Sequence, residues 1–232
     1  MIKAVFFDFF NTLSRYEQSR EQVYIDVCAK YGKKVDLKAL ITAYPAADKY
    51  LRDQLRLKPA AKRNKLNQVN LYMKHATILL RMAGININKI IAFHIVMTWL
   101  KYKWDFIPFE DTLDILKYCK EKAVIVGIIS NIDRDMLDIS KKMGMSPYVD
   151  VYVTSHEAGC DKPAPGIFNL ALQKAGVKPE EAIYIGDQYD SDILGARGVG
   201  ISPILIDRNN LFAEITDCPR IIDLLELKNY LQ

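Results

Sequence analysis

Three groups of polar residues follow apolar, strand-like runs and a fourth precedes a helical pattern, and their types suit nucleophilic attack on an anionic substrate. Asp8 ends the run "IKAVFFD", and Ser130 and Asn131 end "AVIVGIIS". Lys162 lies in "DKPAPGIF", and several acids lie together in "IGDQYDSD". Together these segments supply a carboxylate nucleophile, a hydroxyl with backbone amides, a cation and an acid cluster. Taken singly each has an ordinary explanation, because an Asp after a strand often caps a helix and a Ser-Asn pair often forms a turn.

Alternating strand and helix patterns would position these residues. Residues 2–8 form a β-branched and aromatic run that predicts a buried strand. Further strand patterns lie at 123–130, 149–155, 182–187 and 201–207, and helical patterns lie at 109–122, 133–144, 165–176 and 191–200. This alternation predicts a doubly wound α/β fold with a mostly parallel sheet. Ligands gather at the carboxyl ends of parallel strands, where the polar residues above are expected to meet.

Between the first strand and this alternating region the pattern is helical. Apolar residues recur at helical spacing, and no strand is evident. Asp36 and Asn88 are the expected N-caps of two of these helices, and Pro45 is expected to break one of them. We therefore predict an α/β core formed by residues 1–14 and 105–232, with residues 15–104 inserted as a small all-helical domain.

The inserted domain is strongly basic. Residues 15–104 contain 18 Lys/Arg and 6 Asp/Glu, a balance of +12 in a chain whose net charge is +4. Much of this charge belongs to ordinary solvated helix faces, but it also favours a small anionic substrate. We expect no nucleic-acid partner, because no recognised nucleic-acid motif accompanies the charge. Nothing in the pattern indicates an oligomeric state.

The composition predicts a cytoplasmic protein that does not span a membrane. The four cysteines lie far apart and form no Cys-x-x-Cys pair, which argues against a disulfide framework or zinc site and fits a reducing cytosol. No apolar run approaches the roughly 20 residues that span a bilayer. Asp8 interrupts the first apolar stretch early, so we expect no signal peptide.

Four motifs resemble those of the haloacid dehalogenase-like hydrolase superfamily. They are "DFFNTL", "IISN", "DKPAPGIF" and "IGDQYDSD", which together reach from residue 8 to residue 192. The helical block lies where that superfamily places a small cap domain. The resemblance implies a Rossmann-like α/β core with a helical cap, and hydrolysis through a covalent aspartyl intermediate.

The same resemblance implies roles for individual residues. Asp8 would be the nucleophile, and Thr12 would orient it by a hydrogen bond. Ser130 and Lys162 would complete the catalytic set. Ser130, the Asn131 amide and Lys162 would bind the substrate, with the hydroxyl and the amide holding a phosphate oxygen.

The resemblance also implies a bound Mg²⁺ ion. Asp8, Asp187 and the backbone carbonyl of Phe10 would be ligands, and Asp192 would bind the ion directly or through water. Three acids beside the nucleophile would repel one another without a cation. The acid cluster therefore favours metal-dependent phosphoryl transfer and a phosphatase that acts on a small phosphorylated metabolite.

Phe10 departs from the phosphatase pattern and leaves two alternatives open. Phosphatases of the superfamily usually carry a second Asp there, a general acid and base that contributes about 10²–10⁴-fold. A 2-haloacid dehalogenase needs no such acid, because halide leaves without a proton, but those enzymes work without metal and lack the acid cluster. A non-catalytic phosphate-binding protein is the third reading, although it would not need the intact nucleophile Asp8.

Overall fold

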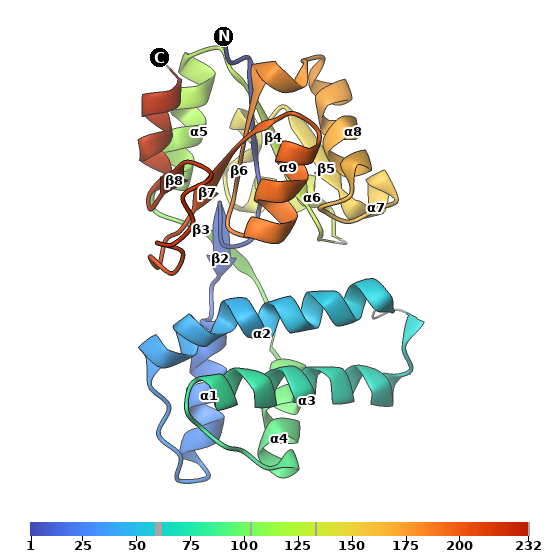
Figure 1. Ribbon diagram of the computed structural model, residues 1–232, viewed down its shortest axis with the longest axis vertical. Helices are drawn as coiled ribbons and strands as arrows, with labels where there is room; N and C mark the ends of the chain where they lie inside the picture. Colours follow the sequence, from blue (N-terminus) through green and yellow to red (C-terminus); the bar gives the residue numbers. More distant parts are fainter. Residues whose placement is uncertain (59–61, 103, 133, 232) are drawn as a thin grey trace. The chain divides into compact units, whose positions relative to one another are not determined.

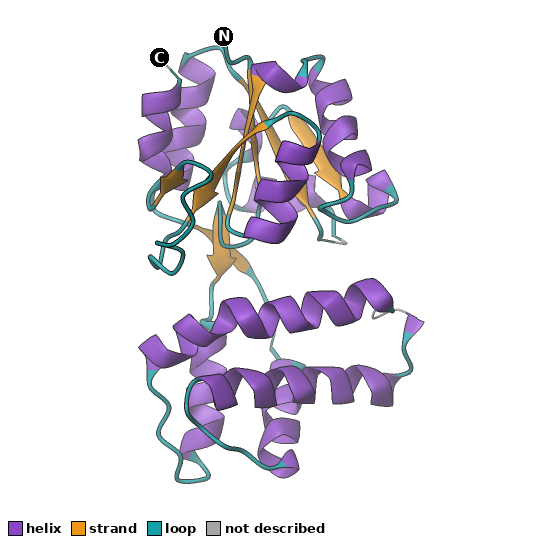
Figure 2. Ribbon diagram, in the orientation of Figure 1, coloured by secondary structure: helices purple, strands orange, loops and turns teal. Residues whose placement is uncertain are grey.

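Two compact units make up the chain in the computed structural model (Figure 1). The first contains Met1–Arg15 and Phe106–Gln232, and the second contains Tyr16–Asp105. These bounds lie within one residue of the predicted ones. Figure 2 shows that strands and helices combine in the first unit, whereas helices dominate the second. The structure describes residues 1–58, 62–102, 104–132 and 134–231.

A six-stranded sheet lies at the centre of the first unit, and all of its strand pairs are parallel, which confirms the predicted fold class. The strand order is β5-β4-β1-β6-β7-β8. The strands are β1 (Ala4–Phe7), β4 (Ile125–Ser130), β5 (Val151–Thr154), β6 (Ala182–Gly186), β7 (Ser202–Ile206) and β8 (Arg220–Ile221). Because β1 pairs with β4 on one side and β6 on the other, Asp8 emerges between the ends of two neighbouring strands.

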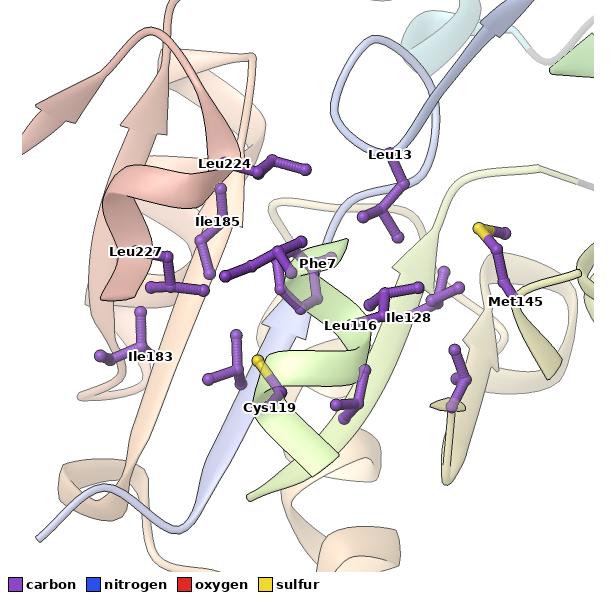
Figure 3. Close-up of a cluster of buried hydrophobic side chains, with 14 of the residues drawn as sticks. Phe7, Leu13, Leu116, Cys119, Ile128, Met145, Ile183, Ile185, Leu224 and Leu227 are labelled. Carbon is purple, nitrogen blue, oxygen red and sulfur yellow. The ribbon is translucent and has the colours of Figure 1, made fainter. Parts of the chain in front are cut away.

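Helices cover both faces of this sheet (Figures 1 and 2). They are α5 (Thr112–Glu121), α6 (Met136–Lys142), α7 (Ser155–Ala158), α8 (Pro165–Ala175) and α9 (Leu194–Gly198), with a π-helical turn (Tyr189–Ile193) and 3₁₀ segments (Ser146–Tyr148, Pro179–Glu181 and Leu224–Tyr230). Side chains of β1 alternate between two buried clusters, since Phe7 packs on the side of α5 and Phe6 on the side of α8. Figure 3 shows the first cluster, where Phe7 lies among residues of α5 and of the C-terminal segment. Burial on both faces explains why β1 is an unbroken apolar run.

A separate two-stranded sheet joins β2 (Ser14–Tyr16) and β3 (Phe106–Pro108). Each of these strands lies in one of the two chain segments that connect the units. The sequence does not predict either strand, because each has only three residues and neither shows a period-two pattern long enough to recognise.

The second unit contains four helices in its described residues, namely α1 (Arg20–Ala29), α2 (Leu37–Leu57), α3 (Lys65–Met82) and α4 (Lys89–Trp99). The predicted caps are confirmed, since Asp36 accepts a hydrogen bond from the backbone of Ala39 and Asn88 accepts one from Ile91. The helices enclose their own apolar core. No helix in the described part of the chain combines the length and apolar character needed to cross a bilayer.

The predicted break at Pro45 is wrong, because α2 continues through it from Leu37 to Leu57. A proline inside a helix removes one backbone hydrogen bond and crowds the carbonyl four residues earlier. Tyr44 and Ala47 flank the proline and are buried in the helical core. Their burial stabilises the continuous helix, and tertiary packing therefore overrides the local signal.

Close packing around Gly127 of β4 leads to a prediction about stability. A Cβ atom built on Gly127 would lie 2.5 Å from Cδ1 of Phe6, whose ring is fully buried and cannot move away. We expect Gly127→Ala to lower the free energy of unfolding by about 1–3 kcal/mol, as overpacking does in other cores. Urea denaturation would measure the change.

Gly198 of α9 provides the matched control. A Cβ atom there would meet no heavy atom within 4 Å, so Gly198→Ala should leave stability unchanged or raise it by up to about 1 kcal/mol through helix propensity. If the two variants are equally stable, close packing against Phe6 does not require glycine at position 127.

Candidate active site

The carboxyl edge of the sheet brings three predicted residues to neighbouring strands. Asp8 follows β1, Ser130 ends β4, and Asp187 follows β6. The parallel register aligns Phe7 with Ile128 and Ile185, so the three strands end close together. Lys162 comes from the loop that precedes α8, and Asp192 from the π-helical turn after β6.

The Lys162 ammonium group is the centre of the site. Nζ donates hydrogen bonds to Asp8 Oδ1 at 2.5 Å, to Asp192 Oδ1 at 2.8 Å and to the Tyr184 hydroxyl at 2.9 Å. The side chain is buried. Burial alone would lower the pKa of Lys162, but the charges of Asp192 and Asp8 outweigh burial and raise it. The lysine is therefore held as a cation beside the predicted nucleophile.

Three carboxylates gather at this site, and two of them, Asp8 and Asp192, contact Lys162. Asp8, Asp187 and Asp192 each offer an oxygen atom, and these atoms lie within 4.8 Å of one another. Burial raises the pKa of Asp8 to about 6 against the opposing charge of Lys162. Burial, followed by the charges of Asp8 and Asp192, also raises the pKa of Asp187 well above its ordinary value. With all three ionised, the cluster and Lys162 together carry a charge of −2.

The residues fit a bound metal ion. Asp187 Oδ1 is buried and has no hydrogen-bond partner. An unpaired buried polar atom is costly, and a carboxylate oxygen in this position is the ligand that a hard divalent cation takes. The orphaned oxygen and the excess negative charge are both accounted for if an ion binds between the carboxylates.

Asp192 is held more tightly than the other two acids. Its Oδ1 accepts from Lys162 and, at 3.0 Å, from the Tyr184 hydroxyl, and its Oδ2 accepts from the backbone of Gln188 at 3.0 Å. The π-helical turn brings it against the end of β6, where a Cβ atom on Gly186 would lie 2.4 Å from the Asp192 carboxyl carbon. Only glycine leaves room for the carboxylate there.

Ser130 and Asn131 lie where the sequence predicts, at the end of β4. The Ser130 hydroxyl is buried and accepts from the Ile132 backbone at 3.3 Å. The Asn131 side chain holds the backbone of Lys162, since Oδ1 accepts from its N–H at 2.8 Å and Nδ2 donates to its carbonyl at 3.4 Å. Asn131 thereby positions the lysine, while a phosphate contact from its backbone amide stays a prediction.

The predicted hydrogen bond from Thr12 to Asp8 is wrong. Thr12 Oγ1 is buried and makes no hydrogen bond, so it does not orient the nucleophile. The chain turns sharply between Asp8 and Thr12, because Asn11 has a φ of 64° and Phe9 O accepts from the backbone of both Leu13 and Ser14. This turn separates the threonine hydroxyl from the carboxylate that sequence proximity suggested it would reach.

Arg208 supports this loop from a distant part of the chain. Its Nη2 donates to the Thr12 carbonyl at 2.7 Å, and its guanidinium group makes a two-pronged ion pair with the buried carboxylate of Asp111. The Arg208 guanidinium carbon also lies 3.9 Å from the centre of the Phe109 ring. Thr112 adds a hydrogen bond to the Leu13 carbonyl at 2.7 Å.

Phe10 follows the nucleophile as a partly buried aromatic residue. Its ring meets that of Phe106 edge to face, with 6.2 Å between ring centres. This packing gives the side chain a structural role but places no acid beside Asp8. Metal binding by the Phe10 carbonyl stays a prediction.

Three residues of the site were missed in the sequence analysis. Tyr184 offered a signal, because it is the only hydroxyl-bearing residue in the strand "AIYIG". Asn11 offered a weaker one, since Asn is among the few residues that tolerate a left-handed turn. Nothing in the sequence pointed to Arg208, because its partners Asp111 and Thr12 lie about 100 and 200 positions away.

Comparisons with known proteins identify the family of this chain. A haloacid dehalogenase-like hydrolase family model matches residues 2–200. Glyceraldehyde 3-phosphate phosphatase of Methanothermobacter thermautotrophicus is 30% identical over 227 residues, which cover 95% of this chain and 90% of that protein. Ribulose-1,5-bisphosphate 5-phosphatase of Halopiger xanaduensis is 32% identical over 110 residues, which cover 47% of this chain and 46% of that protein. Haloacid dehalogenase-like hydrolase domain-containing protein 3 of Mus musculus is 38% identical over 91 residues, which cover 39% of this chain and only 36% of that protein.

Solved structures share the fold at lower identity. A haloacid dehalogenase-like phosphatase from Thermococcus onnurineus has a TM-score of 0.57 and 22% identity, covering 99% of this chain and 98% of that one. A 2-haloacid dehalogenase from Pseudomonas syringae has a TM-score of 0.56 and 21% identity, covering 100% and 98%. The family match over most of the sequence confirms what the four motifs predict: the chain belongs to the haloacid dehalogenase-like hydrolase family and is a hydrolase.

Proposed function

We propose that this hydrolase is a magnesium-dependent phosphatase that acts on a small phosphorylated metabolite through a covalent intermediate on Asp8. The observation that carries the proposal is the cluster of Asp8, Asp187 and Asp192 beside Lys162, in which one buried Asp187 oxygen has no partner. A metal-free mechanism gives no reason for a third carboxylate in such a site. Binding of phosphate alone gives no reason for a carboxylate at the nucleophile position.

The names of two relatives support the substrate class. The relative that aligns over 95% of this chain is a glyceraldehyde 3-phosphate phosphatase, and another is a ribulose-1,5-bisphosphate 5-phosphatase. Both names describe phosphatases of small phosphorylated metabolites. The basic helical unit is consistent with an anionic substrate, and we propose that this unit serves as the cap.

In the proposed reaction, Asp8 attacks the phosphorus atom and the bond to the leaving oxygen breaks. Water then attacks the phosphorus of the aspartyl phosphate, which releases inorganic phosphate and restores Asp8. Lys162 would stabilise the negative charge of the transferring group, and Ser130 with the Asn131 backbone amide would hold one of its oxygens. When bound, Mg²⁺ would supply positive charge that lets two anions approach each other.

The hydrogen bonds of the three acids suggest how they would share the ion. Asp187 Oδ1 is free to bind it directly, and Asp8 uses only Oδ1 for Lys162. Asp192 already accepts from Lys162, Tyr184 and Gln188. We therefore propose that Asp8 and Asp187 bind the ion directly. Of the two predicted alternatives for Asp192, we propose that it binds the ion through water.

Phe10 favours a second candidate function, the dehalogenation of a 2-haloacid. An apolar residue beside the nucleophile is no obstacle when the leaving group is halide, because halide needs no proton. This candidate is second because Phe10 is one position, whereas the acid cluster depends on Asp187, Asp192 and the glycine that makes room for Asp192.

A substrate panel separates the two candidates. Purified protein would be incubated with phosphorylated sugars and glycerates and with 2-haloacids, in Mg²⁺ and in EDTA, while phosphate and halide release are measured. We expect phosphate release that requires Mg²⁺ and is abolished by Asp8→Asn. Phe10→Asp should raise the rate of phosphate release. General acid–base catalysis contributes at least about 10²-fold, and the increase should approach that factor.

The control for Phe10→Asp is its melting temperature, because the variant also loses the contact with Phe106. Halide release that persists in EDTA would overturn the phosphatase proposal in favour of the second candidate. Mg²⁺-dependent phosphate binding without any turnover would favour a non-catalytic protein.

The charge balance of the site leads to a stability prediction. In metal-free protein at pH 7, Lys162→Met leaves Asp8 and Asp192 buried without their cation. We expect a loss of about 3–5 kcal/mol in the free energy of unfolding, the range for breaking a buried ion pair. The double variant with Asp192→Asn should recover part of the loss. Urea denaturation in EDTA would measure both.

Lys174→Met is the matched control. Lys174 pairs with Glu157 on the surface, where its side chain is 36% exposed. An exposed pair contributes at most about 1 kcal/mol, so this variant should be close to the unaltered protein. If the two lysine variants lose the same stability, Lys162 is not the counter-ion that holds the site together.

A further inference from the structure

Asn11 makes a contact for which the reaction outlined above has no use. It lies in the tight loop after β1, where its φ of 64° falls in the left-handed region. Its backbone N–H donates to the Ser14 carbonyl at 2.7 Å, and this bond closes the loop. Such a conformation is accessible to Asn but is easier for Gly, which has no Cβ atom.

The side chain of Asn11 supplies what glycine could not. Nδ2 donates a hydrogen bond to Asp187 Oδ2 at 3.2 Å, although the two residues are 176 positions apart. An ionised carboxylate only accepts hydrogen bonds, so the NH₂ end of the amide must face it. The loop that follows the nucleophile is thereby joined to the acid that follows β6.

This contact divides the two oxygens of Asp187 between separate tasks. Oδ2 is engaged by Asn11, while Oδ1 is buried and has no hydrogen-bond partner. The carboxylate is therefore fixed by one oxygen and free at the other. An ion of small radius such as Mg²⁺ demands near-ideal octahedral geometry, so a ligand held at a set angle binds it better than one that rotates.

We propose that Asn11 is a positioning residue that orients the Asp187 carboxylate for Mg²⁺. The inference rests on the proposed function, since it assumes that Mg²⁺ binds at the acid cluster. It adds a residue that touches neither the ion nor the substrate and acts only through Asp187. Partners of this kind usually change metal affinity about 10- to 100-fold when they are removed.

Asn11→Gly tests the proposal, because glycine keeps the left-handed backbone and removes the side chain that carries the carboxamide. Titration calorimetry with Mg²⁺ alone, without substrate, should show binding about 10- to 100-fold weaker than in the unaltered protein. The rise in melting temperature caused by Mg²⁺ should shift to higher Mg²⁺ concentration by a similar factor. Phosphatase activity should fall at low Mg²⁺ and recover at saturating Mg²⁺, which a merely structural defect would not do.

Asn210→Gly is the matched control. Asn210 also has a positive φ, of 53°, and its side chain also makes a hydrogen bond, since Oδ1 accepts from Arg220 at 2.6 Å. It has no contact with the acid cluster among those the structure describes. We expect Mg²⁺ affinity in this variant to stay within about twofold of the unaltered protein, well inside the change expected at Asn11.

The outcomes separate the inference from the function on which it rests. Unaltered protein that binds no Mg²⁺ would overturn the proposed metal-dependent function and this inference with it. If Asn11→Gly binds Mg²⁺ as tightly as the unaltered protein does, the inference is overturned. The proposed function is then unaffected. A weakening in Asn11→Gly that Asn210→Gly does not share would support the assignment.

Discussion

A buried ammonium group contacting two buried carboxylates is the interaction on which the rest of the site depends. Lys162 can stay charged away from water only because Asp8 and Asp192 accept its hydrogen bonds. This requirement ties together the end of β1, the loop before α8 and the turn after β6. Tyr184 and the Asn131 side chain add uncharged partners that hold the lysine and its backbone in place.

The same arrangement leaves the site short of positive charge. The site contains one ammonium group and three carboxylates, and a phosphorylated substrate would add further negative charge. A divalent cation resolves both problems, because it balances the cluster and gives the orphaned Asp187 oxygen a partner. The chemistry that follows must then proceed with Phe10 two residues after the nucleophile, and the Phe10 side chain has no proton to donate.

The loop after Asp8 shows how a distant scaffold can set local geometry. The five residues that follow the nucleophile form a tight turn, whose backbone carbonyls accept hydrogen bonds from Arg208 and Thr112. Asp111 holds the Arg208 guanidinium group in place. Those contacts explain why the Thr12 hydroxyl does not reach Asp8, and why Asn11 instead reaches Asp187. Residues that are neighbours in sequence are thus turned away from each other by partners about 100 to 200 positions away.

The sequence by itself determined the α/β class, the inserted helical unit and the positions of Asp8, Ser130, Lys162, Asp187 and Asp192. Local patterns are enough for these features, because strand period, helix caps and the fixed place of polar residues at strand ends depend on near neighbours. Only the tertiary structure decided that α2 runs through Pro45, that the Thr12 hydroxyl makes no hydrogen bond, and that Tyr184, Asn11 and Arg208 belong to the site. Each of these depends on packing or hydrogen bonds between segments remote in the chain, which no local pattern records.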